Sequence, residues 1–538
     1  MRKMKRMMTL LLSVCMVLCL LSGCGETEDA STLRVCLPDA PETLDPAMVT
    51  TESEEIVVNH LYENLMKASL NAHGDYDVVY GLARSYGYGD ELNGTQIYTF
   101  TLRDDVTWSD GRPVTAQDFV YAWQRLVDPA TASPNAQLLE MVVGYEEARR
   151  GDVTKLQVSA PDDTTLEVVL KQRCSYFVDV VCSAVATMPL RSDIVEKENW
   201  SMDPAVMVTN GAYYVTAWEN DLLTATARES YYDAKRLGTD ELQIRFAEAA
   251  IAMELYENGE VDFVLGLTDE AIAAQDEEWK ADPYPLVGAL VVNQMAEGTV
   301  GETLRQAMSL VLDRNAIAAA MGARRYWATD GLVPYGIRNS SAAAEFRTEA
   351  GALIENDPEK YESNCAQAKD LLKAQALPEA GRVTLVYENN ELHTKAAQMI
   401  QSMWKEQLGL QVELVGVAEE ELEQVLQRGE FTVALVQVQR TLNDASAFLD
   451  SWVSASEKNH AHIHNTAYDL LMRISTDSAS PVARDAYLKD AERMLLESGF
   501  VIPVYHGTTT WLLRDGLTNL YGDGMGHYYF HNVVEKPQ

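Results

Sequence analysis

The sequence predicts a mixed α/β protein with two or three lobes, on the basis of three observations. The chain has 538 residues, whereas one hydrophobic core stops growing at about 250–300 residues. Residues 382–440 alternate between strand-like and helix-like segments, and residues 98–127 read as a strand, a turn and a helix. Apolar residues make up 47% and charged residues 23% of the chain, which is usual for a globular protein and excludes a mostly disordered or fibrous one.

The N-terminus has the features of an export signal. A basic run at residues 2–6 precedes an apolar run at residues 7–21, which is shorter than the ~20 residues of a membrane-spanning helix. Residues 21–24 (LSGC) resemble a bacterial lipobox, in which the thiol of Cys24 receives a lipid. We expect a lipoprotein signal peptide over 1–23 and a lipidated tether over 24–32. The alternatives are an ordinary signal peptide or an N-terminal anchor.

The charge balance limits the possible partners. Lys and Arg total 43 against 81 Asp and Glu, a formal net charge of −38. This charge repels a phosphate backbone, so we expect no binding to nucleic acid or to an anionic membrane surface.

The segment 98–103 is the first clear strand. Tyr98, Phe100 and Leu102 alternate with polar residues, as in a half-buried strand. Turn residues follow at 109–113, and Thr115 is placed to cap a helix that ends at the Asp128–Pro129 pair.

The segment 382–440 predicts a parallel, doubly wound unit. It reads strand, helix (392–408), strand, helix, strand, with Gly409 as a helix C′ residue. Ligands of such sheets bind beyond the carboxyl ends of the strands. Polar residues 388–390 and 439–441 stand at two of these ends, which makes Asn389, Arg440 and Thr441 candidate ligand contacts. Alternatively, they only cap the strands.

The remaining cysteines match no metal ribbon or redox pair. Cys36, Cys174, Cys182 and Cys365 follow the signal and the lipidation site. On a helix, Cys174 and Cys182 would lie about 12 Å apart along the axis, too far for a disulfide. We expect four buried free thiols.

No catalytic signature is present. The chain lacks GxSxG, HExxH, GxxxxGK[ST] and CxxC motifs. His460, His462 and His464 would share one face of an extended segment and could ligate nickel, copper or zinc. The alternative is a polar loop with unliganded histidines. We therefore expect no enzyme activity, no cofactor and no metal site, with these histidines as the sole metal candidates.

Residues 98–134 resemble the signature region of the family-5 solute-binding proteins of ABC importers, and most closely that of the oligopeptide-binding lipoproteins. Further matching segments follow in family order over essentially the whole mature chain: 44–65, 81–86, 208–218, 256–264, 304–314 and 501–507. The resemblance implies a periplasmic-binding-protein-like fold of two α/β lobes with an additional inserted domain. The expected boundaries are 33–62, 190–290 and 508–538 for lobe I, 63–189 for domain II and 291–507 for lobe II.

The resemblance also implies a function. Such proteins enclose a ligand between the lobes and deliver it to two membrane permeases that two ATPases drive. Peptide-binding members hold the peptide main chain as an added strand would be held. We expect a monomeric, lipid-anchored extracytoplasmic protein with a peptide ligand. The alternative is a protein of the same fold that binds a nickel chelate, a haem-like molecule or a sugar, and an enzyme, a sensor or an adhesin is a third class.

The matching positions depart from the peptide-binding pattern at the strand end 435–442. Relatives carry an Arg, a Trp and an Asp there, and the Asp receives the α-ammonium group of the peptide. Here these positions are Leu435, Val438 and Thr441, with Arg440 just before the last. Residues 288–293 (GALVVN) lack the aromatic strand of the family. Asn135 stands where an aromatic residue often follows Ser-Pro, and it is a further candidate ligand contact.

Other positions match ligand-lining ones. Thr50, Thr51 and Glu52 align with a lining segment, and His393 with a position that can face the peptide carboxylate. His506 lies beside a lining region near the interlobe crossing, although it could equally be hinge packing. These matches and departures suggest that the fold and transport role persist while the usual ammonium clamp does not.

Overall fold

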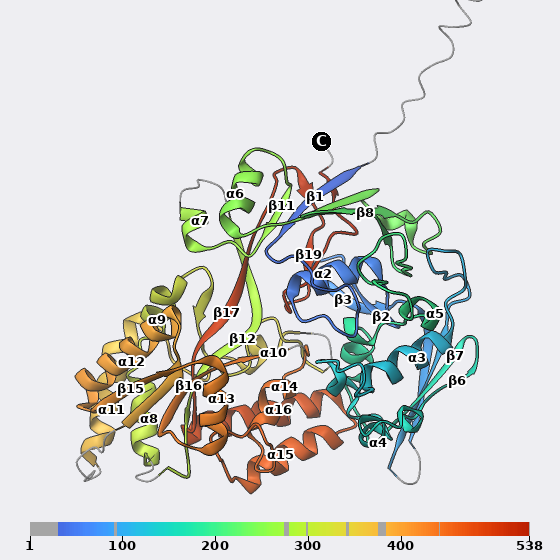
Figure 1. Ribbon diagram of the computed structural model, residues 1–538. Helices are drawn as coiled ribbons and strands as arrows, with labels where there is room; N and C mark the ends of the chain where they lie inside the picture. The colour runs from blue at the N-terminus through green and yellow to red at the C-terminus, as the bar shows by residue number, and fades with distance from the viewer. Residues whose placement is uncertain are drawn as a thin grey trace, which may run out of the picture.

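The computed structural model describes residues 31–90, 94–273, 279–296, 300–340, 344–374, 383–440 and 442–536. It has the mixed α/β architecture that the sequence predicts (Figure 1). An eleven-stranded sheet runs through the molecule. Its strands in spatial order are β15 (Val412–Val417), β14 (Val383–Glu388), β16 (Val433–Gln439), β12 (Lys280–Val292), β17 (Val501–Leu513), β11 (Phe263–Leu265), β1 (Thr32–Leu37), β10 (Glu241–Phe246), β9 (Leu222–Ala227) and β8 (Tyr213–Glu219), with β13 (Tyr326–Ala328) paired to β17.

Two long strands join the lobes. β12 and β17 are antiparallel and pair from Lys280 opposite Trp511 to Val291 opposite Val501. In Figure 1 they run side by side between the upper part of the molecule, which holds β1 and β11, and the lower left part, which holds β14–β16. The register shifts between Tyr284 and Val287 and again at Gly288, so the ladder is irregular where it passes between the lobes.

Lobe II is the predicted doubly wound unit. β14 pairs in parallel with both β15 and β16, and Gly409 ends the first connecting helix at φ 72°. Alternate residues of β12 enter two separate hydrophobic clusters, one on each face of the sheet. Helices that contribute to these clusters are α8 (Glu302–Leu310), α9 (Arg314–Gly322), α11 (Tyr361–Ala374) and α12 (Glu391–Leu408) on one face, and α10 (Phe346–Ala350), α13 (Glu419–Arg428), α14 (Ser446–Leu449), α15 (Thr466–Asp477) and α16 (Pro481–Ser498) on the other.

Domain II contains the strand and helix predicted at 98–127. β5 (Gln96–Leu102) buries alternate residues, and α3 (Ala116–Val127) follows Thr115, whose backbone N–H donates to Asp118 Oδ2 at 2.8 Å. The four-stranded sheet has the order β4 (Ala83–Asp90), β5, β7 (Thr165–Leu170) and β6 (Val158–Asp162). The hairpin β2 (Met66–Leu70) and β3 (Tyr76–Tyr80), α4 (Tyr145–Arg149) and a π-helical turn η3 (Phe177–Val181) also belong to this part, and α5 (Ser192–Val195) follows at the start of the next lobe I segment.

Lobe I and domain II share one hydrophobic core. A single cluster extends from Val35 in β1 through Phe100 and Trp123 in domain II to Phe530 near the C-terminus. Lobe II has cores of its own. Lobe I also contains α2 (Glu52–Leu61), α6 (Ala249–Glu257), α7 (Asp269–Ala273) and the short strands β18 (Leu517–Thr518), β19 (Tyr521–Gly522), β20 (Tyr528–Tyr529) and β21 (Val534–Glu535).

Two further predictions concern the thiols and the N-terminus. Cys36, Cys174, Cys182 and Cys365 are buried and free, as predicted. Among the residues described, no helix has the length and apolar character needed to cross a membrane. The expected signal peptide, and Cys24 with it, lies outside the described residues.

Candidate functional site

A large cleft lies where lobe I, domain II and lobe II meet. It encloses about 1560 Å³ of unfilled space, including the part open to solvent. Its walls come from α2 and residues 231–237 of lobe I, from the β2–β3 hairpin and residues 135–138 and 175–188 of domain II, from residues 338–340 and 443–444 of lobe II, and from residues 521–532 near the C-terminus. Ligand sites are typically such concavities at domain junctions, so this cleft is the candidate site.

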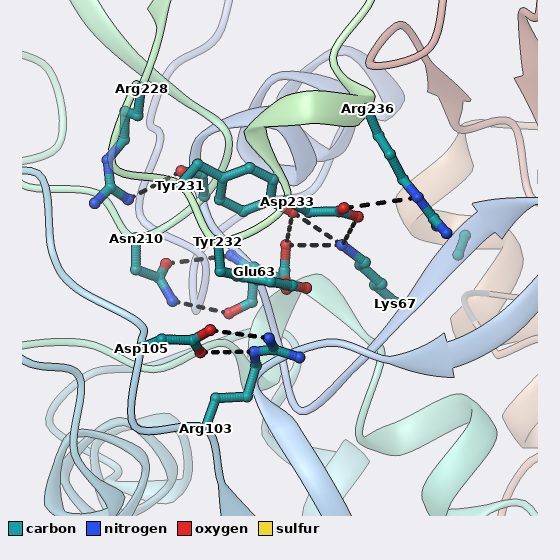
Figure 2. Close-up of polar contacts among 12 residues, drawn as sticks. Glu63, Lys67, Arg103, Asp105, Asn210, Arg228, Tyr231, Tyr232, Asp233 and Arg236 are labelled. Atoms are coloured by element: carbon teal, nitrogen blue, oxygen red, sulfur yellow. Dashed lines mark hydrogen bonds and ion pairs between the residues drawn. The ribbon is translucent and has the colours of Figure 1, made fainter.

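One wall of the cleft is organised around the buried Glu63 (Figure 2). Tyr231 and Tyr232 both donate their hydroxyl hydrogens to its carboxylate. Lys67 Nζ lies 3.4 Å from Glu63 Oε2 and 3.7 Å from Asp233 Oδ2. Burial and the nearby Glu63 charge raise the pKa of Tyr231, which keeps this phenol a neutral donor. The wall is therefore polar, satisfied and preorganised.

Two of the lobe II residues in the lining, Asn443 and Arg338, bond to other parts of the cleft wall. Asn443 Nδ2 donates to Tyr76 Oη and to the Asp523 carbonyl, both at 3.0 Å. The Arg338 guanidinium stacks 3.8 Å from the centroid of the Tyr76 ring and donates to Asp75 Oδ2 at 3.3 Å. These contacts connect lobe II to domain II and to the C-terminal segment at one end of the cleft.

An acidic group with a charged histidine lies at the N-terminal half of α2. His527 Nδ1 is 2.7 Å from Asp523 Oδ2, and its Nε2 contacts Glu55. The two carboxylates raise the pKa of His527 despite its burial. Burial also raises the pKa of Glu52 to about 8, and Glu52 Oε1 has no hydrogen-bond partner among the described residues.

The predicted segment Thr50–Glu52 begins α2. Thr51 is the N-cap and forms a capping box with Glu54, whose Oε2 also accepts from the Thr50 N–H at 2.7 Å. Asn135 lines the cleft, and its Nδ2 donates to the Val49 carbonyl at 2.8 Å. These residues are therefore brought together beside the cleft, although their observed bonds fix the local backbone.

The predicted lobe II residues lie outside the cleft lining. Asn389 is exposed at the end of β14. The ring Nε2 of the buried His393 lies 3.1 Å from Gln437 Oε1 and 3.2 Å from Tyr505 Oη. Arg440 donates to the Ala447 carbonyl at 2.6 Å and to Ser451 Oγ at 2.7 Å. Thr441 lies outside the described residues.

His506 is packed in the crossing between the lobes. It belongs to β17 and is buried, with Nε2 2.7 Å from Thr329 Oγ1 and 3.1 Å from the Gly331 carbonyl. It does not belong to the described cleft lining. Burial, with a smaller effect of Arg347, lowers the pKa of His506 to about 3.

This buried histidine predicts a pH-dependent stability. An unfolded histidine has a pKa near 6.5, whereas folded His506 has a pKa of about 3. Protonation therefore favours the unfolded state, and the free energy of unfolding decreases as the pH falls from about 6.5 toward 3. Between pH 7 and pH 5 the loss through His506 should be about 2 kcal/mol. Urea unfolding of the wild type and of His506→Gln at both pH values measures it. Equal losses in the two proteins would contradict the assignment.

The three histidines at 460–464 do not form the one-faced extended segment that a metal site would need. His462 has φ 52°, and Asn459 bonds both the N–H and the carbonyl of Ile463. The segment is a turn, as the polar-loop alternative stated. Within the described ranges, no group of three histidine, cysteine or carboxylate residues could hold a metal ion.

Several cleft residues escaped the sequence analysis. Glu63 and Tyr231 are 168 residues apart, and no motif contains both. Asp179 lies in the cleft wall inside an otherwise apolar run, residues 177–182. An isolated acidic residue in such a run is a signal that could have indicated it.

Comparisons with known proteins agree with this architecture. The profile of the bacterial extracellular solute-binding proteins, family 5, matches residues 77–460. The periplasmic oligopeptide-binding protein OppA of Escherichia coli (strain K12) is 29% identical over 513 residues, covering 91% of this chain and 90% of that protein. The probable deoxycholate-binding periplasmic protein YgiS of the same organism is 31% identical over 489 residues, covering 88% of each chain.

A solved structure extends the comparison to the arrangement of the lobes. The periplasmic murein tripeptide-binding protein MppA, in its unliganded open form, matches with a TM-score of 0.81 and 25% identity, covering 94% of this chain and 98% of that one. The lobes described here are therefore arranged much as in an open solute-binding protein.

Proposed function

Because the chain belongs to the bacterial extracellular solute-binding proteins of family 5, we propose that it captures peptides between its lobes and delivers them to the permease of an ABC importer. The observation that carries the proposal is the cleft at the junction of three domains in a chain whose relatives include OppA. A lipid on Cys24 would hold the protein at the outer surface of the cell membrane. It would act as a monomer, without catalysis and without a cofactor.

The hydrophobic core shared by lobe I and domain II indicates which parts of the protein would move together when the cleft closes. Lobe I and domain II would move as one body because one hydrophobic cluster spans both. Lobe II would close against them by bending at β12 and β17, a hinge motion. In this scheme the domain boundaries predicted from the sequence separate two rigid bodies at residues 290 and 507.

Native mass spectrometry of the soluble form that starts at Ala30 tests the ligand class. The protein is purified from the expression host, and its bound material is released and identified. A spread of peptide masses supports the proposal, whereas a single non-peptide mass or a metal adduct contradicts it.

A second candidate ligand is a non-peptide solute. The relative at 31% identity is named for probable deoxycholate binding, and the cleft wall includes the apolar Met66, Leu138 and Met188 besides Arg338. An amphipathic carboxylate could place its ring system on the apolar wall and its charge near the guanidinium. The same mass measurement distinguishes this candidate. The nickel-chelate alternative has lost its sequence support, because residues 460–464 form a turn.

The missing ammonium clamp gives a direct prediction. Leu435 is buried in β16 and Val438 is apolar, and the hydroxyl of Thr441 cannot form an ion pair. Thr441→Asp should therefore raise the affinity for trialanine at least about tenfold, the size of one charge-assisted hydrogen bond. Calorimetric titration with trialanine and N-acetyl-trialanine measures the gain, with Thr441→Asn as the uncharged control. Tight binding of trialanine by the wild type would refute the altered clamp.

A further inference from the structure

The cleft lining carries an excess of acidic side chains. Its carboxylates are Glu55, Glu63, Asp179, Asp233, Asp444 and Asp523, against the cations Lys67, Arg236 and Arg338 and the charged His527. Such a lining favours a cationic group on the ligand. An acidic lining alone identifies no binding site. A carboxylate that already has a partner in the protein is not free to bind a ligand cation, so the partner of each one must be known.

Five of these carboxylates already have partners. Glu55 and Asp523 contact His527, and Glu63 accepts from two tyrosines. Asp233 lies near Lys67 and Arg236, and Asp444 is bound by Arg484 at 2.8 Å.

Asp179 differs from them. Its side chain makes no hydrogen bond or ion pair within the described part of the chain, and burial alone raises its pKa, since no cation offsets it. A carboxylate kept partly out of water without a partner is unfavourable. Asp179 lies in the wall of the candidate site, so a cationic group of a ligand could pair with it there and offset the unfavourable desolvation of the carboxylate.

The turn that carries Asp179 presents a second unpaired polar atom. Asp179 lies in the π-helical turn η3, which the Cys182 N–H closes by donating to the Phe177 carbonyl at 3.0 Å. Ser175, four residues before Asp179, also lines the cleft, and its buried Oγ has no partner. Ser175 lies just before this turn, so the two polar side chains belong to one short segment of the cleft wall.

A third unpaired group lines the same cleft. Tyr62 is only 2% exposed, and its buried hydroxyl has no hydrogen-bond partner among the described residues. Buried hydroxyls normally have hydrogen-bond partners. An unpaired hydroxyl and an unpaired carboxylate in one segment of the wall, as at Ser175 and Asp179, suit a group with several N–H donors and a positive charge.

We infer that Asp179, together with Ser175 of the same wall segment, binds the primary ammonium group of a lysine-like side chain on a bound peptide. The inference rests on the proposed peptide-binding function and specifies the ligand. An ammonium offers three donors, one or two for the carboxylate and another for the Ser175 hydroxyl. The site lies in domain II, so it is separate from the strand end at 435–442 and requires no α-ammonium group.

The test compares two pools of N-acetylated alanine tripeptides. One pool carries lysine at each position in turn, and the other carries norleucine, which keeps the aliphatic chain but lacks the ammonium. Acetylation removes the α-ammonium group, so the Thr441 position does not contribute. Competition between the pools for the soluble form is read by native mass spectrometry. The wild type should prefer lysine by about tenfold or more.

Asp179→Asn should abolish this preference, whereas Asp163→Asn, which removes an exposed carboxylate of the same domain, should retain it. Asp179→Asn should unfold at the temperature of the wild type or above it, because the substitution breaks no bond. Asp179→Glu should retain part of the preference.

The outcomes separate the two proposals. If peptides bind but lysine is not preferred, or if Asp179→Asn keeps the preference, the inference is wrong and peptide binding stands. If the wild type binds neither pool, the inference is wrong, and peptide binding fails with it when trialanine, which keeps its α-ammonium group, does not bind either.

Discussion

Replacing Arg347 by Met should destabilise lobe II by about 3–5 kcal/mol, the usual effect of removing one partner of a buried ion pair. Arg347 in α10 and Glu492 in α16 are both 0% exposed, with Nη1–Oε1 at 2.6 Å and Nη2–Oε2 at 2.9 Å. Glu492 Oε1 also accepts from the backbone N–H groups of Leu332 and Val333. The Met variant leaves the Glu492 charge buried without its counter-ion.

Urea unfolding measures this loss, with Arg493→Met as the matched control. Arg493 is the next residue of α16, and its pair with Asp490 is about half exposed, at 49% and 55%. Such a surface pair contributes about 0–1 kcal/mol. A loss below 1 kcal/mol in Arg347→Met would mean that Glu492 is compensated by other groups.

Gly288→Ala should be the most damaging small substitution in the crossing strands. A Cβ at this position would lie 2.1 Å from Cζ of Tyr505, well inside van der Waals contact. The ring is buried and its hydroxyl lies 3.2 Å from His393 Nε2, so it cannot move without disturbing both lobe II and β17. We expect a loss of about 3 kcal/mol, at the upper end of overpacking effects.

Gly87→Ala in β4 is the control for the glycine change itself. Nothing lies within 4 Å of a Cβ added there, so the stability should stay within about 1 kcal/mol of the wild type. Denaturant midpoints of the two variants give the comparison. Similar midpoints would show that the Tyr505 ring yields easily.

Local patterns predicted the elements whose partners are near in sequence. The alternation at 98–103 and the strand and helix segments of 382–440 carry their own periodicity, and β5, α3 and β14–β16 follow them. The histidine segment shows the limit of such reasoning. The three histidines would share one face only on an extended backbone, but the Asn459 side chain bonds to the Ile463 backbone and closes a turn.

The site was less predictable because distant segments build it. The wall around Glu63 joins residues 63–67 to residues 231–236, and no periodicity relates such segments. Positions carried over by resemblance were more mixed. Asn135 lies in the lining, whereas His393 and His506 are held inside lobe II and the crossing strands.

The antiparallel pairing of β11 with β17 affects when the chain can fold during its synthesis. Residues 263–265 need residues 511–513 as sheet partners, and His60 accepts from the N–H of Phe530 at 2.9 Å. At about 5–20 residues per second, roughly 12–50 s separate the appearance of residue 265 from that of its partner strand at residue 513. During that time the first lobe has an open sheet edge and an incomplete core. The chain order therefore delays completion of the N-terminal lobe until its C-terminal partner segments have been synthesised.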